Sequence, residues 1–242
     1  MRILITNDDG IYGEGLSLLA EWSKKLGEVV VVAPKSEQSA KGQSIILGRP
    51  FEIKKSDAFD HLGIVSYSID STPADCVRVA ADKLGKFDMC FSGINRGLNL
   101  GCDVAYSGTC GAAFEANYAD IPSVAFSAKS DSIEKAAENL DVIWNFISSN
   151  RLFDFCSMLN VNIPIEVNGI RLTEQGGIFY RDNFVPCGDD TYIAQTFSAY
   201  RPKEDPNEDV DTDAVFMGYI SVSPLSIKRT DIKALEALKN NR

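Results

Sequence analysis

The chain has 242 residues, of which 45% are apolar and 24% are charged, and its formal net charge is -10 at pH 7. A chain of this length and composition can bury a substantial core, as one large α/β domain or as one domain with an appendage. The negative charge excludes a broad surface for nucleic acids or anionic membranes, although one small anionic ligand could still bind at a local site.

Targeting signals and cysteine usage indicate a cytoplasmic protein. The apolar run at the N-terminus stops at Asp8, which makes it too short for a signal peptide. No stretch reaches the roughly 18 apolar residues of a membrane span. The six cysteines include no C-x-x-C pair and His61 is the one imidazole, so we expect free thiols rather than a zinc site or disulfides.

The first part of the chain alternates strand and helix patterns. Arg2–Thr6 and Glu28–Pro34 are continuous apolar runs rich in β-branched residues, as expected of parallel strands buried on both faces. Between them, the apolar spacing in Gly15–Leu26 predicts a helix and hence a βαβ unit. Further strands are expected at Phe51–Lys55, Ile64–Ile69, Phe87–Ser92, Ile121–Ser127 and Met158–Pro164. Further helices are expected from Thr72 as N-cap to about Leu84, around Ala112-Ala113, and over Ser132–Ile147.

The pattern changes after about Ile165. Gly169–Glu174, Gly177–Pro186 and Thr191–Tyr200 resemble strands with no helix between them, which favours antiparallel hairpins. The acidic stretch Pro202–Asp213 is expected to be a solvated loop, and Thr230–Asn241 has the pattern of a short amphipathic helix.

These patterns predict a single domain over residues 1–242. Residues 1–165 would form a Rossmann-like α/β core, a three-layer sandwich with a mostly parallel sheet. Residues 166–242 would form a β-rich C-terminal extension with a hairpin and a terminal helix.

Four polar stretches follow predicted strands or open predicted helices, where open α/β sheets bind ligands. They are Asn7–Gly10, Pro34–Ser44, Ser71–Cys76 and Ser92–Ala116.

The first stretch places two carboxylates, Asp8 and Asp9, directly after a buried strand. Each negative charge raises the cost of ionising the other, so a bound cation is the natural compensation. Mg²⁺ takes oxygen ligands and typically uses one or two carboxylates, and Gly10 allows a tight turn after the pair. The alternative is that Asp9 caps a helix and Asp8 is solvated.

The last stretch is rich in glycine, with Gly93, Gly97, Gly101, Gly108 and Gly111. Its exposed backbone N–H groups could cradle an oxyanion, particularly at Ser107-Gly108-Thr109, which precedes a predicted helix. Asn95 and Asn99 add neutral oxygen donors. The alternative is a long surface loop, but together with the acidic pair these features favour a metal–phosphate site.

The sequence resembles the SurE survival protein family of metal-dependent nucleoside-monophosphate phosphatases. The matching segments cover most of the chain: ILITNDDG, VVAPKSEQSAKG, STPADCV, SGINRGLNLGCDVAYSGTCGAAFEA, LNVNIP and the pattern D-x-x-A-x-x-x-G-Y-I-S-V-S-P-L over Asp211–Leu225.

The resemblance implies one divalent ion per subunit, Mg²⁺ or Mn²⁺, held by Asp8, Asp9, Ser39 and Asn95. Ser36 and Ser44 flank Ser39, and the loop reads SEQSAKG where many relatives have Ser-Gly. The implied phosphate-binding residues are Asn95, Ser107, Gly108 and Thr109, and the implied catalytic residues are Asp8, Asp9 and Asn95.

The implied reaction is hydrolysis of a nucleoside 5′- or 3′-monophosphate to nucleoside and phosphate. Asp8 is the candidate general base or water-orienting carboxylate and Asp9 the firmer ligand, but the sequence does not separate these roles. Family members are dimers or tetramers that exchange C-terminal segments, which implies a homo-oligomer. Gly176–Ala199 and the final helix would be the exchanged parts.

Two other functions compete with this one. A phosphatase of the haloacid-dehalogenase type needs two aspartates spaced D-x-D, and Asn7-Asp8-Asp9-Gly10 lacks that spacing. A non-catalytic nucleotide-sensing stress protein would retain the pocket without turnover. Cys102 and Cys110 are expected to serve packing, and His61 lies outside every motif.

Overall fold

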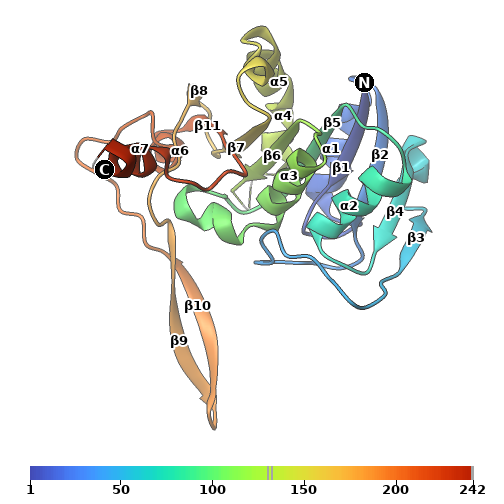
Figure 1. The fold of residues 1–242 in the computed structure, drawn as a ribbon, viewed down its shortest axis with the longest axis horizontal. Coiled ribbons are helices and arrows are strands. Elements are labelled where there is room, and N and C mark those ends of the chain that lie inside the picture. The colour runs from blue at the N-terminus through green and yellow to red at the C-terminus, as the bar shows by residue number, and fades with distance from the viewer. Residues whose placement is uncertain (130, 132, 241–242) are drawn as a thin grey trace.

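The computed structural model describes residues 1–129, 131 and 133–240, and its centre is a sheet of nine strands (Figure 1). The elements up to residue 128 are β1 (Arg2–Thr6), α1 (Glu14–Ser23), β2 (Glu28–Pro34), β3 (Ile53–Ser56), η1 (Asp60–Leu62), β4 (Val65–Ile69), α2 (Pro73–Lys83), β5 (Met89–Arg96), η2 (Gly101–Tyr106), α3 (Gly108–Tyr118) and β6 (Ser123–Ala128). The remaining elements are α4 (Ile133–Glu138), α5 (Leu140–Ser149), η3 (Leu152–Asp154), β7 (Met158–Ile163), β8 (Gly169–Leu172), β9 (Tyr180–Gly188), β10 (Thr191–Ser198), α6 (Asp211–Phe216), β11 (Tyr219–Pro224) and α7 (Ile232–Asn240).

The sheet has the order β3-β4-β2-β1-β5-β6-β7-β11-β8 and is mostly parallel. Its antiparallel pairs are β3 with β4 and β11 with β7. The predicted α/β three-layer fold with a mostly parallel sheet is therefore confirmed. The division into a core and an extension at residue 165 stays a prediction. The strands β8 and β11, which come after residue 165, belong to the same sheet, and α6 packs on it.

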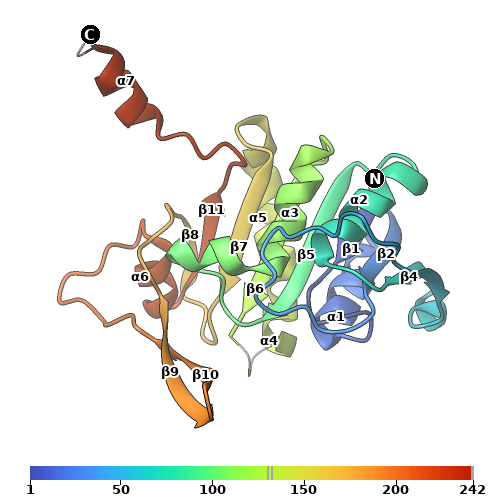
Figure 2. The same ribbon diagram turned by 60° about the horizontal axis from the view of Figure 1, so that its bottom comes forward.

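Helices cover both faces of the sheet, which explains the continuous apolar runs of the central strands (Figure 2). In β1, Ile3 and Ile5 pack in the cluster that contains residues of α1, α4 and α5. Leu4, which points to the opposite face, packs in the cluster that contains residues of α2 and α3. The alternation of side chains along a strand thus supplies a core to each layer.

The helix expected over Ser132–Ile147 is two helices, α4 and α5, and Ser132 itself lies outside the described residues. The break falls at Asn139. Its backbone N–H bonds to the carbonyl of Ala136 at 3.0 Å, and its side-chain amide donates to the carbonyl of Lys135 at 2.8 Å. Asn competes in this way for the carbonyls of a helix, so the regular α-helical ladder ends there.

The strand expected at Gly169–Glu174 exists as β8, but the expectation that it belongs to an antiparallel hairpin is wrong. It pairs in parallel with β11, because the chain between them crosses over through α6 before returning to the sheet. The other two predicted strands, β9 and β10, do form an antiparallel hairpin.

The acidic stretch Pro202–Asp213 is not solvated throughout, contrary to the prediction. Asp211 and Asp213 are completely buried, and α6 begins at Asp211. Asp213 accepts hydrogen bonds from the Lys203 ammonium at 2.7 Å, the Tyr200 hydroxyl at 3.0 Å and the backbone N–H of Asn207 at 3.0 Å. Burial is possible because these donors lie within the same stretch or next to it.

The hairpin β9–β10 and the helix α7 stand away from the body of the protein (Figures 1 and 2). None of the residues of α7 is buried. The predicted hairpin and terminal helix are confirmed, although residue 241, the predicted end of the helix, lies outside the described residues. Within the part of the chain that the structure describes, no helix is both long and apolar enough to cross a membrane.

Candidate metal–phosphate site

The predicted site stretches meet at one edge of the sheet. Strands β2, β1 and β5 are neighbours and parallel, so the loops after their carboxyl ends lie together. These loops and the hairpin root line a cleft of about 860 Å³. Of the predicted residues, the cleft wall includes Asp8, Asp9, Ser39, Asn95 and Ser107.

The turn after β1 is built by its own polar groups. The Asn7 side-chain amide donates to the carbonyl of Gly10 at 3.0 Å and closes the turn around the two carboxylates. Gly10 has a φ of +98°, a conformation that L-residues with a side chain rarely adopt. The turn therefore needs the Asn-Asp-Asp-Gly sequence for its shape as well as for its charges.

Asp8 is a buried carboxylate that meets the start of α3. Its Oδ1 atom accepts a hydrogen bond from the Thr109 hydroxyl at 2.6 Å. A Cβ atom at Gly108 would lie 2.9 Å from both the Cβ and Oδ2 atoms of Asp8, so only glycine permits this approach. Burial raises the pKa of Asp8 to about 6, and Asp9 adds to the rise, while the Thr109 hydroxyl opposes it.

Asp9 is less buried and has a more varied charged environment. Burial raises its pKa, the charge of Glu37 raises it further, and Arg96 opposes the rise. Glu37 and Arg96 both line the cleft. The sequence did not predict a role for Glu37 or Arg96, although Glu37 lies in the polar stretch Pro34–Ser44 and Arg96 in the stretch Ser92–Ala116.

Ser39 and Asn95 keep oxygen atoms available toward the cleft. Ser39 is exposed and its hydroxyl donates to Glu37 at 2.5 Å, which leaves the oxygen lone pairs for a ligand. The Asn95 side-chain nitrogen donates to the carbonyl of Gly97 at 2.7 Å, which leaves Oδ1 as an acceptor.

A divalent cation fits this donor set. Two carboxylates, a hydroxyl and an amide oxygen are hard oxygen ligands of the kind that Mg²⁺ and Mn²⁺ take. Among the described residues, no group of three or more His, Cys, Asp or Glu side chains is arranged to hold a metal ion, so the neutral oxygens would be needed.

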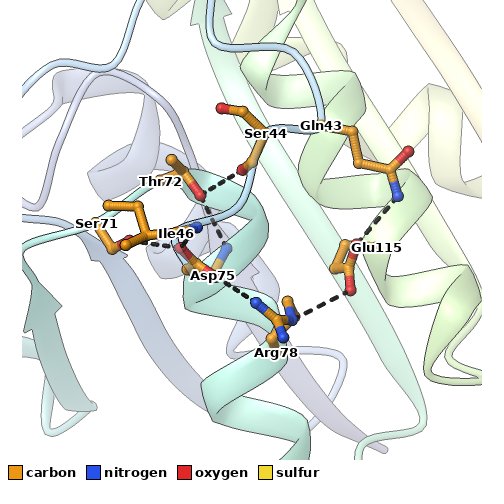
Figure 3. Close-up of polar contacts among 8 residues, drawn as sticks. All are labelled: Gln43, Ser44, Ile46, Ser71, Thr72, Asp75, Arg78 and Glu115. Atoms are coloured by element: carbon orange, nitrogen blue, oxygen red, sulfur yellow. Dashed lines mark hydrogen bonds and ion pairs between the residues drawn. The ribbon is translucent and has the colours of Figure 1, made fainter. Parts of the chain in front are cut away.

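The loop that carries Ser39 is fastened at several points. The backbone N–H of Gln38 donates to the carbonyl of Asp8 at 2.7 Å, and that of Gly42 donates to the carbonyl of Tyr106 at 2.9 Å. Figure 3 shows the far end of the loop bound to α2 through Asp75, a residue of the STPADCV segment. Asp75 accepts from the backbone N–H of Ile46 at 2.9 Å, and Thr72 donates to the carbonyl of Ser44 at 2.7 Å.

The side chains of Arg78 and Glu115 extend this network to α3. Arg78 donates to Asp75 at 2.8 Å and lies 3.8 Å from a carboxylate oxygen of Glu115, which in turn accepts from Gln43 at 3.0 Å (Figure 3). The STPADCV segment therefore serves to hold the Ser39 loop rather than to line the cleft.

The glycine-rich loop is held from the other side by β7. The carbonyl of Asn99 accepts from the side chains of Asn160 at 2.8 Å and Asn162 at 3.0 Å. The Asn99 side chain donates to Ser127 at 2.7 Å. Asn99 thus anchors the loop, and the LNVNIP segment provides its anchor points.

Asp211 and Asp103 join the same loop to the root of the hairpin. Asp211 accepts from the backbone N–H groups of Gly101 and Gly176, both at 2.8 Å. Asp103 accepts from those of Phe179 at 2.9 Å and Tyr180 at 2.7 Å. The sequence pattern does not reveal these hydrogen bonds, because each joins residues more than thirty positions apart along the chain.

The predicted phosphate-binding residues Ser107 and Thr109 make structural hydrogen bonds within the protein. The Ser107 side chain accepts from the backbone N–H of Cys110 at 3.0 Å and so caps α3. Thr109 is completely buried behind Asp8 and does not line the cleft. A direct phosphate contact of Ser107, Gly108 and Thr109 stays a prediction.

Cys102 and Cys110 differ in their exposure to solvent. Cys110 is completely buried, as expected for packing. The packing expectation is wrong for Cys102, which is exposed and lines the cleft.

Ionised Asp8 should lower the stability of the metal-free protein. The folded protein holds the Asp8 proton up to a pKa of about 6 instead of the ordinary 3.8, so its free energy of unfolding falls as the pH rises through that window. The fall amounts to about 3 kcal/mol for this group. In chelator, Asp8→Asn should therefore match the wild type near pH 4 and exceed it by up to that amount at pH 7.5, as measured by urea unfolding. The exposed Asp205→Asn is the control, and an Asp8→Asn difference that does not grow with pH would contradict the burial argument.

Comparison with known proteins agrees with this geometry. The family model described as survival protein SurE matches residues 3–182. The 5′-nucleotidase SurE of Alkaliphilus metalliredigens is 37% identical, over 99% of this chain and 98% of its own length. The 5′-nucleotidase SurE 1 of Thermus thermophilus is 38% identical, over 98% of this chain and 96% of its own.

A solved structure supports the same relationship. The crystal structure of the SurE protein from Aquifex aeolicus superposes with a TM-score of 0.79 at 32% identity and covers 99% of each chain. The resemblance inferred from the motifs is thereby confirmed, and this chain belongs to the SurE family.

Proposed function

We propose that the protein is a divalent-metal-dependent phosphomonoesterase that hydrolyses nucleoside 5′- or 3′-monophosphates to nucleoside and phosphate. The observation that carries this proposal is the convergence of Asp8, Asp9, Ser39 and Asn95 on one cleft, beside the start of α3. The relatives named 5′-nucleotidase SurE match the whole chain, which supports the same reaction class.

The proposed metal ligands are Asp8, Asp9, Ser39 and Asn95, holding one Mg²⁺ or Mn²⁺ per subunit. When bound, the cation supplies Lewis acidity toward a phosphoryl oxygen and lowers the pKa of water. The chain's own residues would do the positioning: Asn95 and Ser107 line the cleft and are proposed to contact the phosphate. Asp8 is the proposed general base or water-orienting group, and Asp9 the firmer ligand.

A panel of phosphomonoesters with Mg²⁺, Mn²⁺ or chelator tests the proposal. We expect release of inorganic phosphate from nucleoside monophosphates with either metal and a loss of at least 100-fold in chelator. Asp9→Asn should remove turnover, whereas the exposed Asp205→Asn should keep it. A folded protein that binds the metal and nucleotide but releases no phosphate would favour the nucleotide-sensing alternative.

Thr109 is proposed to act through Asp8, because its hydroxyl hydrogen-bonds the carboxylate. Groups that orient metal ligands in this way typically contribute 10- to 100-fold in metal affinity or activity. Thr109→Val should weaken Mn²⁺ binding by about that factor, whereas Thr109→Ser, which keeps the hydroxyl, should bind Mn²⁺ like the wild type. Calorimetric titration measures both variants. Equal Mn²⁺ affinity in Thr109→Val and wild type, together with a raised KM, would instead support direct phosphate contact.

We also propose a homo-oligomer, a dimer or tetramer, in which the hairpin and α7 contact another subunit. The hairpin exposes Phe184, Tyr192 and Ile193, and α7 exposes Ile232 and Leu238. Isolated two-stranded hairpins are marginally stable in water, so a partner surface would stabilise this one.

Light scattering at micromolar concentration should give at least twice the mass of one chain. Deleting Gly176–Ala199 should reduce the assembly to single chains, and a wild-type monomer would contradict the proposal.

We further propose a cytoplasmic location, in keeping with six free cysteines. Fractionation of the producing cells would test the location.

A further inference from the structure

A second hollow opens beside the catalytic cleft. Its volume is about 530 Å³, and Leu98 and Tyr180 belong to the walls of both hollows. The two hollows therefore lie next to each other at the root of the hairpin.

The two hollows differ in chemistry. The catalytic cleft carries the carboxylates and hydroxyls of the candidate metal–phosphate site. The wall of the second hollow includes the aromatic residues Phe179, Tyr180 and Phe216 and the apolar Val215, with the charged residues Lys129 and Glu166 also lining it. Phe216 packs against Tyr200 with ring centroids 4.3 Å apart and still leaves 51% of its surface exposed. An exposed ring held by a neighbouring ring is suited to stack on a flat ligand.

We propose that this second hollow, named here the aromatic hollow, is the nucleobase subsite of the enzyme. The inference rests on the proposed function, since the substrate class supplies a charged phosphate at one end and a flat heterocycle at the other. Every nucleobase has a π-face, and stacking on an aromatic side chain is worth about 1–3 kcal/mol per base. The phosphate would lie at Asp8 and Asp9 while the base reaches past Tyr180 to Phe216.

The aromatic hollow also offers polar atoms for the edge of a base. Asn168 and Ser198 line it. The Asn168 side-chain nitrogen donates to the carbonyl of Met217 at 2.9 Å, which fixes the amide and leaves Oδ1 as an acceptor. Such an acceptor can bind the exocyclic amino group of adenine or cytosine.

The wall between the two hollows is tied to the catalytic loop. Asp103, which lines the cleft, accepts from the backbone N–H groups of Phe179 and Tyr180. The backbone N–H of Cys102 donates to the carbonyl of Gly177 at 3.0 Å. These bonds fix the distance between the aromatic rings and the phosphate site, which a subsite for a two-part substrate requires.

Two substrates that differ only by the base test the subsite. Adenosine 5′-monophosphate and ribose 5-phosphate are compared at saturating Mn²⁺ in the wild type and in Phe216→Ala. We expect Phe216→Ala to raise KM for the nucleotide about 5- to 150-fold, the range that the stacking energy implies, with kcat nearly constant. Ribose 5-phosphate should be hydrolysed equally well by both proteins. Phe216→Tyr keeps a stacking ring and should keep the wild-type KM.

Two further variants locate the effect. Phe155→Ala removes an exposed ring that lines neither hollow and lies outside the hairpin, and it should change the hydrolysis of neither substrate. Tyr106 is an exposed tyrosine that lines the catalytic cleft and not the aromatic hollow. A nucleotide-selective loss in Tyr106→Ala but not in Phe216→Ala would place the base in the catalytic cleft and overturn the proposal.

Calorimetric binding of adenosine, which has no phosphate, separates failure of the subsite from failure of the proposed function. Binding to the wild type that is lost in Phe216→Ala supports the subsite even if no phosphate is released from any ester. Absence of adenosine binding, for instance because a second copy of the chain covers the hollow, overturns it. Equal losses for both substrates in Phe216→Ala also overturn it, because the ring would then act on the phosphate site or on the fold.

Discussion

The hydrogen bond from Thr109 to the buried carboxylate of Asp8 is the contact on which the candidate-site edge of the sheet depends. It joins the end of β1 to the start of α3, and the absence of a side chain at Gly108 allows the close approach. Burial makes the ionised form of Asp8 costly, as its raised pKa shows. A cation in the cleft would relieve that cost, so the same burial that strains the metal-free protein favours metal binding.

The rest of the site is positioned by polar contacts from parts of the chain that carry no proposed chemistry. Asp75 holds the Ser39 loop to α2, and the asparagines of β7 hold the carbonyl of Asn99. Asp211 fastens Gly101 to Gly176. These donors and acceptors are largely buried and mutually satisfied, so they hold the loops against the sheet that carries them. Loop residues can then keep the geometry that a metal–phosphate site needs.

The expectations that failed did so for reasons that the sequence alone does not contain. Pro202–Asp213 has the composition of a solvated loop, yet Asp211 and Asp213 are buried because Gly101, Gly176 and Lys203 supply their hydrogen bonds. The amino-acid composition gives the number of charged side chains but does not reveal the hydrogen-bond partner of each one. The continuous helix pattern over 132–147 likewise does not show that Asn139 bonds to its own preceding turn.

The sequence by itself determined the strand–helix alternation, the βαβ start, the acidic turn at Asp8 and Asp9 and the glycine-rich loop, because these depend on periodicity and on neighbouring residues. It also determined family membership, since the motifs are contiguous. Only the tertiary structure decided that Thr109 serves Asp8, that Glu37 and Arg96 share the cleft with the carboxylates, and that the hairpin root forms its wall. Those contacts join residues far apart along the chain, and their existence depends on how the sheet brings loop ends together, which no local pattern encodes.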